Sequence, residues 1–215
     1  MVAIAATSPR YWKAIMNFKD RTLTEVAAAT ATHLKHIGVN VVVVGGSAIT
    51  IHVPEVYTSY DIDFAVTTGI DKPRITAALD DLGFKLNGRT YVNPTTTYTV
   101  DIVANTPYID DRPIHDYAHI ATNVGEVQVL HLEDAIADRI AAFLYWNDSQ
   151  SLDVAERAVA SAYKTLRWDR LEEALKQLDS RGAKFTARFD LALKNLRRSY
   201  KKARKDSRAQ QFTAD

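Results

Sequence analysis

Cysteine is absent from the 215-residue chain, and so is any long apolar run. Without cysteine, disulfide bonds, thiolate metal sites and cysteine nucleophiles are excluded. Without a run of about 18 apolar residues, we expect no membrane-spanning helix. The apolar residues 1–6 are too few for the core of a signal peptide, and no basic residue leads them. We therefore expect a cytoplasmic protein that does not insert into membranes.

Net charge is almost absent too, at +1, but the charges are distributed unevenly. From Arg188 onward, the chain holds 9 of its 27 Lys and Arg residues and only 3 of its 26 Asp and Glu residues. A basic C-terminal segment therefore follows an acidic body. Such a segment predicts contact with an anionic partner, or else forms the solvated face of a last helix.

Hydrophobic periodicity divides the chain into a mixed half and a helical half. In the first half it predicts a helix over residues 22–37, capped by Thr22 or Thr24 and ended by Gly38, and another over residues 73–82. Runs of β-branched and apolar residues predict strands over residues 41–44, 62–66, 98–103 and 126–130.

After Leu132 the pattern is helical. Glu133 and Asp134 place negative charge in a first helical turn, and further helices are predicted over residues 152–166, 168–178 and 183–205. We therefore predict an α+β fold with two domains. A mixed sheet with flanking helices would occupy residues 1–130, with its core from about residue 20, and a helical domain would occupy residues 131–215.

The residues suited to chemistry follow the valine strand. Gly45, Gly46 and Ser47 end that strand, and glycines there leave backbone N–H groups able to approach a phosphate closely. Thirteen residues separate this turn from the sequence Asp61-Ile62-Asp63-Phe64. Because side chains alternate along a strand, the two aspartates should share one face, about 7 Å apart, while their apolar neighbours enter the core.

A third carboxylate, Asp101, stands in the middle of the apolar strand over residues 98–103. A buried carboxylate is costly unless it is paired or binds a metal. If this strand lies beside that of Asp61 and Asp63, three acids surround one point. Such a site can hold Mg²⁺, with two ions expected and Mn²⁺ as a substitute, for in-line attack on phosphorus.

The order of these features resembles the nucleotidyltransferase superfamily of the polymerase β type. The shared features are a strand, the turn Gly45-Gly46-Ser47, a short helix, the Asp61–Asp63 strand and Asp101 on a later strand. The resemblance implies that the turn binds the triphosphate of an NTP such as ATP. It also implies that Asp61, Asp63 and Asp101 are catalytic residues and metal ligands.

A narrower resemblance lies in the helical half. The helical region of the AbiEii/DUF1814 nucleotidyltransferases is similar to two segments here, residues 132–140 (LEDAIADRI) and Ser151-Leu152-Asp153. That family includes toxins of toxin–antitoxin and phage-defence systems. This resemblance implies that Arg139, in place of the family's usual lysine, contacts the nucleotide phosphates and that Asp153 supports the active site. Tyr57 stands where that family commonly has arginine, and DUF6036-like and aminoglycoside-modifying branches share much of the pattern.

Three of these residues also have simpler structural explanations. Ser47 can cap the short helix that follows it. Arg139 can be a surface arginine paired with Glu133 or Asp134, and Asp153 can be a charge at a helix N-terminus.

We expect an enzyme that transfers a nucleoside monophosphate from an NTP to a hydroxyl and releases pyrophosphate. The resemblance implies a macromolecular acceptor, either tRNA or protein, and a toxin that has a cognate antitoxin. The alternatives are a nucleotidyltransferase with a small-molecule acceptor and a non-catalytic module that is an antitoxin or a nucleotide-binding protein. The presence of Asp61, Asp63 and Asp101 together favours an enzyme over the non-catalytic module.

Overall fold

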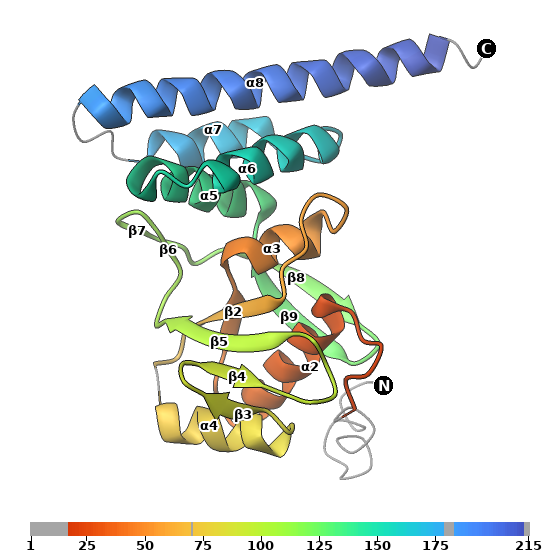
Figure 1. The fold of residues 1–215 in the computed structure, drawn as a ribbon, viewed down its shortest axis with the longest axis vertical. Coiled ribbons are helices and arrows are strands. Elements are labelled where there is room, and N and C mark those ends of the chain that lie inside the picture. The colour runs from red at the N-terminus through yellow and green to blue at the C-terminus, as the bar shows by residue number, and fades with distance from the viewer. Residues whose placement is uncertain (1–16, 70, 179–182, 213–215) are drawn as a thin grey trace. The chain divides into compact units, whose positions relative to one another are not determined.

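A mixed seven-stranded sheet organises the first part of the chain in the computed structural model, which describes residues 17–69, 71–178 and 183–212 (Figure 1). Its strands lie in the order β3-β4-β5-β2-β1-β9-β8. Two neighbouring pairs, β2 with β5 and β1 with β9, are parallel, and the other pairs are antiparallel. The predicted α+β class with a mixed sheet is confirmed.

The central strands match the predicted apolar runs. The bounds of all seven are β1 (Val41–Val43), β2 (Asp61–Val66), β3 (Lys85–Asn87), β4 (Thr90–Val92), β5 (Thr99–Ala104), β8 (Tyr117–Thr122) and β9 (Gly125–Leu130). A separate hairpin pairs β6 (Tyr108–Ile109) with β7 (Arg112–Pro113). Its two-residue loop is Asp110-Asp111, with Asp110 in the left-handed region at φ +55°.

Chain contacts divide the molecule into two compact units, each described by itself. The sheet unit comprises Met1–Ser47, Ser59–Pro107 and His115–Leu130. The helical unit comprises Ala48–Thr58, Tyr108–Ile114 and His131–Asp215. Helix α3 (Gly45–His52) begins in the first unit and continues into the second.

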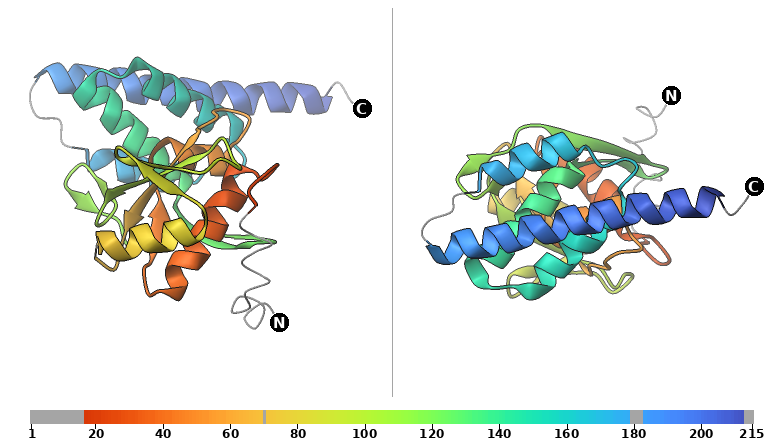
Figure 2. Two further views of the ribbon diagram at one scale, coloured as in Figure 1. Left: turned by 60° about the horizontal axis from the view of Figure 1, so that its bottom comes forward. Right: turned by 90° about the horizontal axis from the view of Figure 1, so that it is seen from above.

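Two helices cover the sheet in the sheet unit: α2 (Leu23–His36) and α4 (Lys72–Asp81), which lie against each other (Figure 2, left). Thr22 caps α2, as predicted: its hydroxyl accepts the N–H of Glu25, whose carboxylate accepts the N–H of Thr22. Gly38, at φ +79°, follows the end of α2 in a conformation that favours glycine. Asp71 caps α4 in a similar way, through the N–H of Arg74.

Four helices build most of the helical unit: α5 (Leu132–Trp146), α6 (Ser149–Ser161), α7 (Trp168–Lys176) and α8 (Ala183–Phe212). Seen from above, α8 runs across α5 and α6, and it contacts both (Figure 2, right). Helix α6 begins earlier than predicted because Asp148 caps it, accepting the N–H groups of Gln150 and Ser151. No helix in the described ranges is both long and apolar enough to cross a bilayer.

A buried cluster of charges joins the elements of the helical unit. Asp134, which is 1% exposed, accepts hydrogen bonds from Arg112 at 2.8 Å and from Arg170 at 2.6 Å. The neighbouring Glu133, also buried, accepts the backbone N–H of Arg167 at 2.9 Å. The predicted negative first turn of α5 is therefore present, and its carboxylates connect α5 to β7 and to the start of α7.

Candidate active site

The parallel pairing of β2 with β5 brings the three predicted acids together. Asp63 is the register partner of Asp101, and Asp61 is the partner of Thr99. Partners across a parallel pair lie about 5 Å apart on one face, and alternate residues of one strand lie about 7 Å apart on that face. One patch of the sheet therefore has four residues at its corners: Asp61, Asp63, Thr99 and Asp101.

The apolar neighbours of these acids fix which face they occupy. Ile62 and Phe64 are fully buried, whereas Asp61 is exposed and Asp63 is half-buried. Val100, beside Ile62 in the register, is fully buried too. Burial of each such side chain contributes roughly 1.5–3 kcal/mol. A one-residue slip of β2 would expose this apolar set and bury the acids, so the alternation holds the carboxylates on the open face.

Two observations bear on whether a divalent cation fits here. The Oδ1 atom of Asp101 is buried and has no hydrogen-bond partner among the described residues, and leaving such an acceptor unpaired costs roughly 1–3 kcal/mol. Carboxylate oxygens are also the ligands that Mg²⁺ and Mn²⁺ prefer. A cation beside Asp101 would satisfy this oxygen, so the residues fit a hard divalent ion.

Cation binding would require some side-chain rotation. The hydroxyl of Thr99 donates a 2.6 Å hydrogen bond to Oδ1 of Asp61, so the second oxygen of this carboxylate is the one that would turn to a cation. In the described part of the chain, no three His, Cys, Asp or Glu side chains already converge as ligands of one ion. The backbone register supplies the positions of the acids, and rotation about the side-chain bonds would bring their oxygens together.

The predicted Gly-Gly-Ser turn lies directly beside Asp63. Gly45, the first residue of α3, has φ +64°, a conformation that favours glycine. The backbone N–H of Val44 donates to the carbonyl of Asp63 at 2.9 Å. The fully buried Ser47 hydroxyl donates to the carbonyl of Val44 at 2.8 Å and accepts the N–H of Asp63 at 3.2 Å.

These bonds define what Ser47 does in the fold. It stands at the third position of α3 and joins the first turn of that helix to the acid strand. Its hydroxyl proton is used by the carbonyl of Val44. A phosphate at this turn would therefore meet the backbone and the positive end of the helix dipole first.

Sequence reasoning missed two features of the site. One is Thr99, which holds Asp61; its place two residues before Asp101 on one strand already puts both on one face. The other is a pair of aromatic rings, Tyr60 and Tyr98, which stack with centroids 6.3 Å apart and planes 26° apart. Tyr60 is 60% exposed and directly precedes Asp61, so a flat apolar surface adjoins the acids.

The other two predicted site residues belong to the helical unit. On α5, Arg139 donates to Asp138 at 2.6 Å, so the alternative pairing with Glu133 or Asp134 is wrong. Arginines from β7 and α7 hold those two acids instead. On α6, Asp153 forms an exposed ion pair with Arg157 at 2.8 Å, four residues on. Roles for Arg139 and Asp153 at a nucleotide stay predictions.

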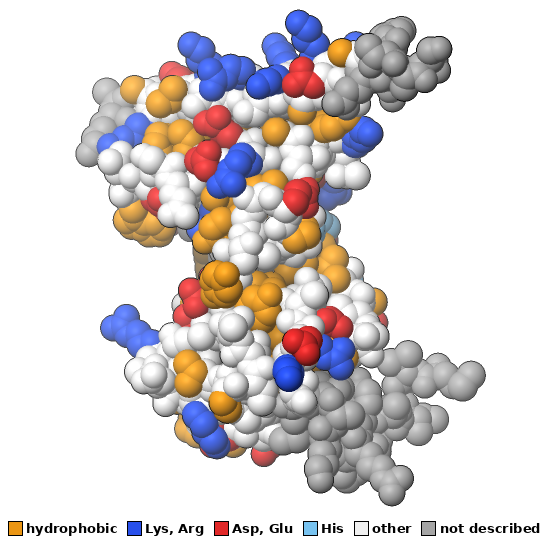
Figure 3. Space-filling view, turned by 45° about the vertical axis from the view of Figure 1, so that its right-hand side comes forward, with side chains coloured by type: hydrophobic (Ala, Val, Ile, Leu, Met, Phe, Trp, Pro, Cys, Tyr) orange, Lys and Arg blue, Asp and Glu red, His pale blue; other side chains and the backbone are white. Residues whose placement is uncertain are grey.

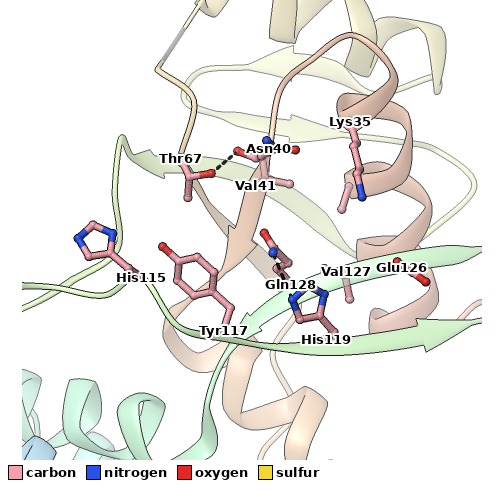
Figure 4. Close-up of a pocket in the computed structure, with 11 residues that line it drawn as sticks. Lys35, Asn40, Val41, Thr67, His115, Tyr117, His119, Glu126, Val127 and Gln128 are labelled. Carbon is pink, nitrogen blue, oxygen red and sulfur yellow. Dashed lines mark hydrogen bonds between the residues drawn. The ribbon is translucent and has the colours of Figure 1, made fainter.

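A cavity of about 410 Å³ lies in the sheet unit (Figure 4), and none of the three acids lines it. Its lining includes Val41 of β1 and Val127 of β9, which directly precede the paired residues Val42 and Gln128. Its polar lining comprises Lys35, Asn40, Thr67, His115, Tyr117, His119, Glu126 and Gln128. Asn40 precedes β1 and Val44 follows it, so the cavity and the acids adjoin opposite ends of that strand. One acid among these residues does not make a carboxylate site.

Comparison with known proteins adds little beyond this geometry. No protein-family model matches the chain, and no curated protein sequence matches it. Among solved structures, it is similar to an antigenic nucleotidyltransferase-like protein from Paracoccidioides brasiliensis. That likeness has a TM-score of 0.43 and 12% identity, and it covers 80% of this chain and 94% of the other. A function for this chain therefore has to be argued from the site itself.

Proposed function

We propose that this chain is a divalent-metal-dependent nucleotidyltransferase whose active site contains Asp61, Asp63 and Asp101. The observation that carries the proposal is the pairing of Asp63 with Asp101, whose buried Oδ1 has no hydrogen-bond partner in the described ranges. Three carboxylates on one face beside a Gly-Gly-Ser turn form an arrangement suited to a metal–triphosphate complex. A merely structural role would leave the orphaned oxygen without an explanation.

The residues divide the work as follows. Asp61, Asp63 and Asp101 would hold Mg²⁺, which supplies positive charge to the triphosphate when bound. Gly45 and Gly46 present the first turn of α3 to the phosphates. Thr99 orients Asp61 through its hydrogen bond, and the exposed ring of Tyr60 offers a surface on which the nucleobase stacks.

The reaction is a substitution at the α-phosphorus of the NTP. An acceptor hydroxyl oxygen attacks this phosphorus, the new O–P bond forms, and the bond to the β-phosphate bridging oxygen breaks. Pyrophosphate leaves with that pair of electrons. The carboxylate of Asp101 also helps to remove the proton of the attacking hydroxyl, as a general base.

The resemblance in the helical half supports a finer proposal. Arg139 would contact the phosphates and Asp153 would support the site, as in AbiEii-like toxins. The acceptor would then be a macromolecule, tRNA or protein, and an antitoxin would restrain the enzyme. Arg139→Ala should raise the KM for the NTP and Arg139→Lys should largely restore it; an unchanged KM in Arg139→Ala would refute this part alone.

Isotope placement tests the reaction class. The full chain, Mg²⁺ and either α-³²P- or γ-³²P-labelled NTPs would be incubated with RNA, with a protein lysate and with aminoglycosides. Label from the α-position should enter one acceptor, and label from the γ-position should appear in pyrophosphate. Entry of the γ-label into an acceptor would contradict the proposal. So would a double variant, Asp61→Ala/Asp63→Ala, that still labels the acceptor at half the wild-type rate.

A further inference from the structure

One face of α8 gathers positive charge along several turns. Figure 3 shows Lys and Arg side chains clustered along this helix, at the top of the view. We define the basic face of α8 as Lys194, Arg197, Arg198, Lys201, Lys202 and Lys205. All six side chains are exposed, and together with Asp190 and Leu193 they line an open groove.

The fold does not require these charges. The described side chains of α8 that are buried are Ala192 and Leu196. Tyr200, four residues after Leu196 and so on the same side of the helix, lies with its ring against that of Trp168. Within the described residues, Arg197 is the member of the basic face that forms an ion pair, with Glu172 at 3.0 Å. Packing within the helical unit therefore explains why Ala192 and Leu196 are apolar. It does not explain why most residues of the basic face are charged.

The spacing of the charges opposes helix stability. Residues four apart on a helix are neighbours, and like charges there are destabilising. The basic face contains four such pairs: Lys194 with Arg198, Arg197 with Lys201, Arg198 with Lys202, and Lys201 with Lys205. A bound polyanion would convert this repulsion into attraction.

The chemistry of the face favours a nucleic acid over other polyanions. Its length is about 16 Å at about 1.5 Å per residue, over which a duplex presents about nine phosphates. Arginine forks bind phosphate oxygens in pairs. Membrane-surface helices carry large apolar side chains beside their charges, and the cores of protein interfaces are depleted of charged residues. Apart from Leu193, the lining of this groove is charged.

We propose that the basic face of α8 binds the phosphate backbone of a nucleic acid without sequence preference. This binding needs neither metal nor NTP, so it stands or falls separately from the proposed catalysis. Where a nucleic acid also serves as the acceptor, the same surface would hold it.

The test measures binding of fluorescein-labelled RNA, single-stranded DNA and duplex DNA to the full chain by anisotropy. EDTA is present, and the salt concentration is varied. The test variant replaces Lys194, Arg198, Lys201 and Lys205 with Gln. A control with the same loss of charge replaces the exposed residues Lys19, Lys72, Arg89 and Lys164 with Gln.

The test variant should bind at least tenfold more weakly than wild type, and the control should stay within twofold. The log–log salt slope should flatten by roughly 0.7–0.9 for each phosphate that the variant no longer neutralises. Equal weakening in the test variant and the control would overturn the proposal, as would unchanged binding by the test variant. Tighter binding of polyglutamate or of phosphatidylserine vesicles than of any nucleic acid would overturn it too.

Integrity of the helix is checked separately. Because the test variant removes like-charge repulsion, circular dichroism should show helicity equal to or above that of wild type. Reduced helicity would move the test to Lys201→Gln/Lys205→Gln. That pair should still weaken binding about threefold or more, and its failure to do so would count against the proposal.

Discussion

Asp63 on β2 and Asp101 on β5 are register partners across a parallel pair of strands, so two carboxylates face each other on one side of the sheet. Two negative charges about 5 Å apart repel by roughly 1–3 kcal/mol in a medium between protein surface and water. This repulsion is a cost that the fold bears when no cation is bound. It predicts how stability responds to substitution and to metal.

Asp63→Asn should therefore stabilise the protein in EDTA, by about 1 kcal/mol, as measured by urea unfolding. Addition of Mn²⁺ should raise the melting temperature of wild type, because a ligand of the folded state stabilises it by about 2.7 kcal/mol at one hundred times its Kd. The variant should lose most of that rise. The result against a shared metal site would be an Asp63→Asn protein that is less stable than wild type in EDTA and whose melting temperature rises as much with Mn²⁺.

Thr99 is expected to act as a positioning residue through Asp61. Removing a hydrogen bond that orients a ligand typically weakens metal affinity about 10–100-fold. Thr99→Val should therefore weaken Mn²⁺ binding about tenfold in calorimetry, and Thr99→Ser, which keeps the hydroxyl, should retain it. If both variants bind as wild type does, the 2.6 Å bond to Asp61 has no bearing on the metal.

Asp134 is expected to matter for folding. It lies buried between Arg112 and Arg170, and removal of one partner of a buried ion pair costs about 3–5 kcal/mol. Asp134→Ala should lose stability on this scale in denaturant unfolding. The matched substitution Asp138→Ala, also on α5 but half-exposed, should lose less than about 1 kcal/mol. Similar losses in the two variants would contradict the view of Asp134 as the centre of the cluster.

His33 gives the fold a pH dependence. Burial lowers the pKa of His33 below its usual 6.5, although Asp81, 3.7 Å away, opposes the shift. The unfolded chain then binds a proton more readily than the folded chain, so stability rises with pH in this range. The stabilisation should be complete above pH 6.5 and fall as the pH drops below that value.

In His33→Gln the free energy of unfolding should change less between about pH 6.5 and about pH 5 than in wild type. The comparison uses slopes, so a general loss of stability in the variant does not affect it. Parallel slopes for the two proteins would show that His33 does not titrate with folding.

Much of the central sheet could be predicted from local patterns. Four consecutive valines and the alternation of Asp61 to Phe64 indicate β1 and β2, and both lie where expected. Strands β3 and β8, at the edges of the sheet, and β4, beside β3, were not predicted. All three residues of β3 are exposed. In β8 the polar His119 interrupts the apolar residues, and none of its six residues is buried, so neither strand carries the continuous apolar run that marks a buried strand. Their pairing comes from the neighbouring strands.

The strands that carry the three acids were predicted, but the way in which they pair was not. The sequence indicates three acids on strands, whereas the pairing of Asp63 with Asp101 depends on the register of segments 38 residues apart. The same holds for the bond between the buried Ser47 hydroxyl and Asp63. Spacing alone likewise could not show that Asp134 pairs with Arg112 and Arg170. Such non-local pairings are set by the whole fold.

The most direct test of the proposed site is a Mn²⁺ titration followed by electron paramagnetic resonance, with a non-hydrolysable NTP analogue present. Wild type should remove the signal of free Mn²⁺. Asp63→Asn and Asp101→Asn should each bind Mn²⁺ at least tenfold more weakly, whereas Asp20→Asn, at an exposed position outside the site, should bind as wild type does. Equal Mn²⁺ affinity in all four proteins would contradict a metal site at these carboxylates.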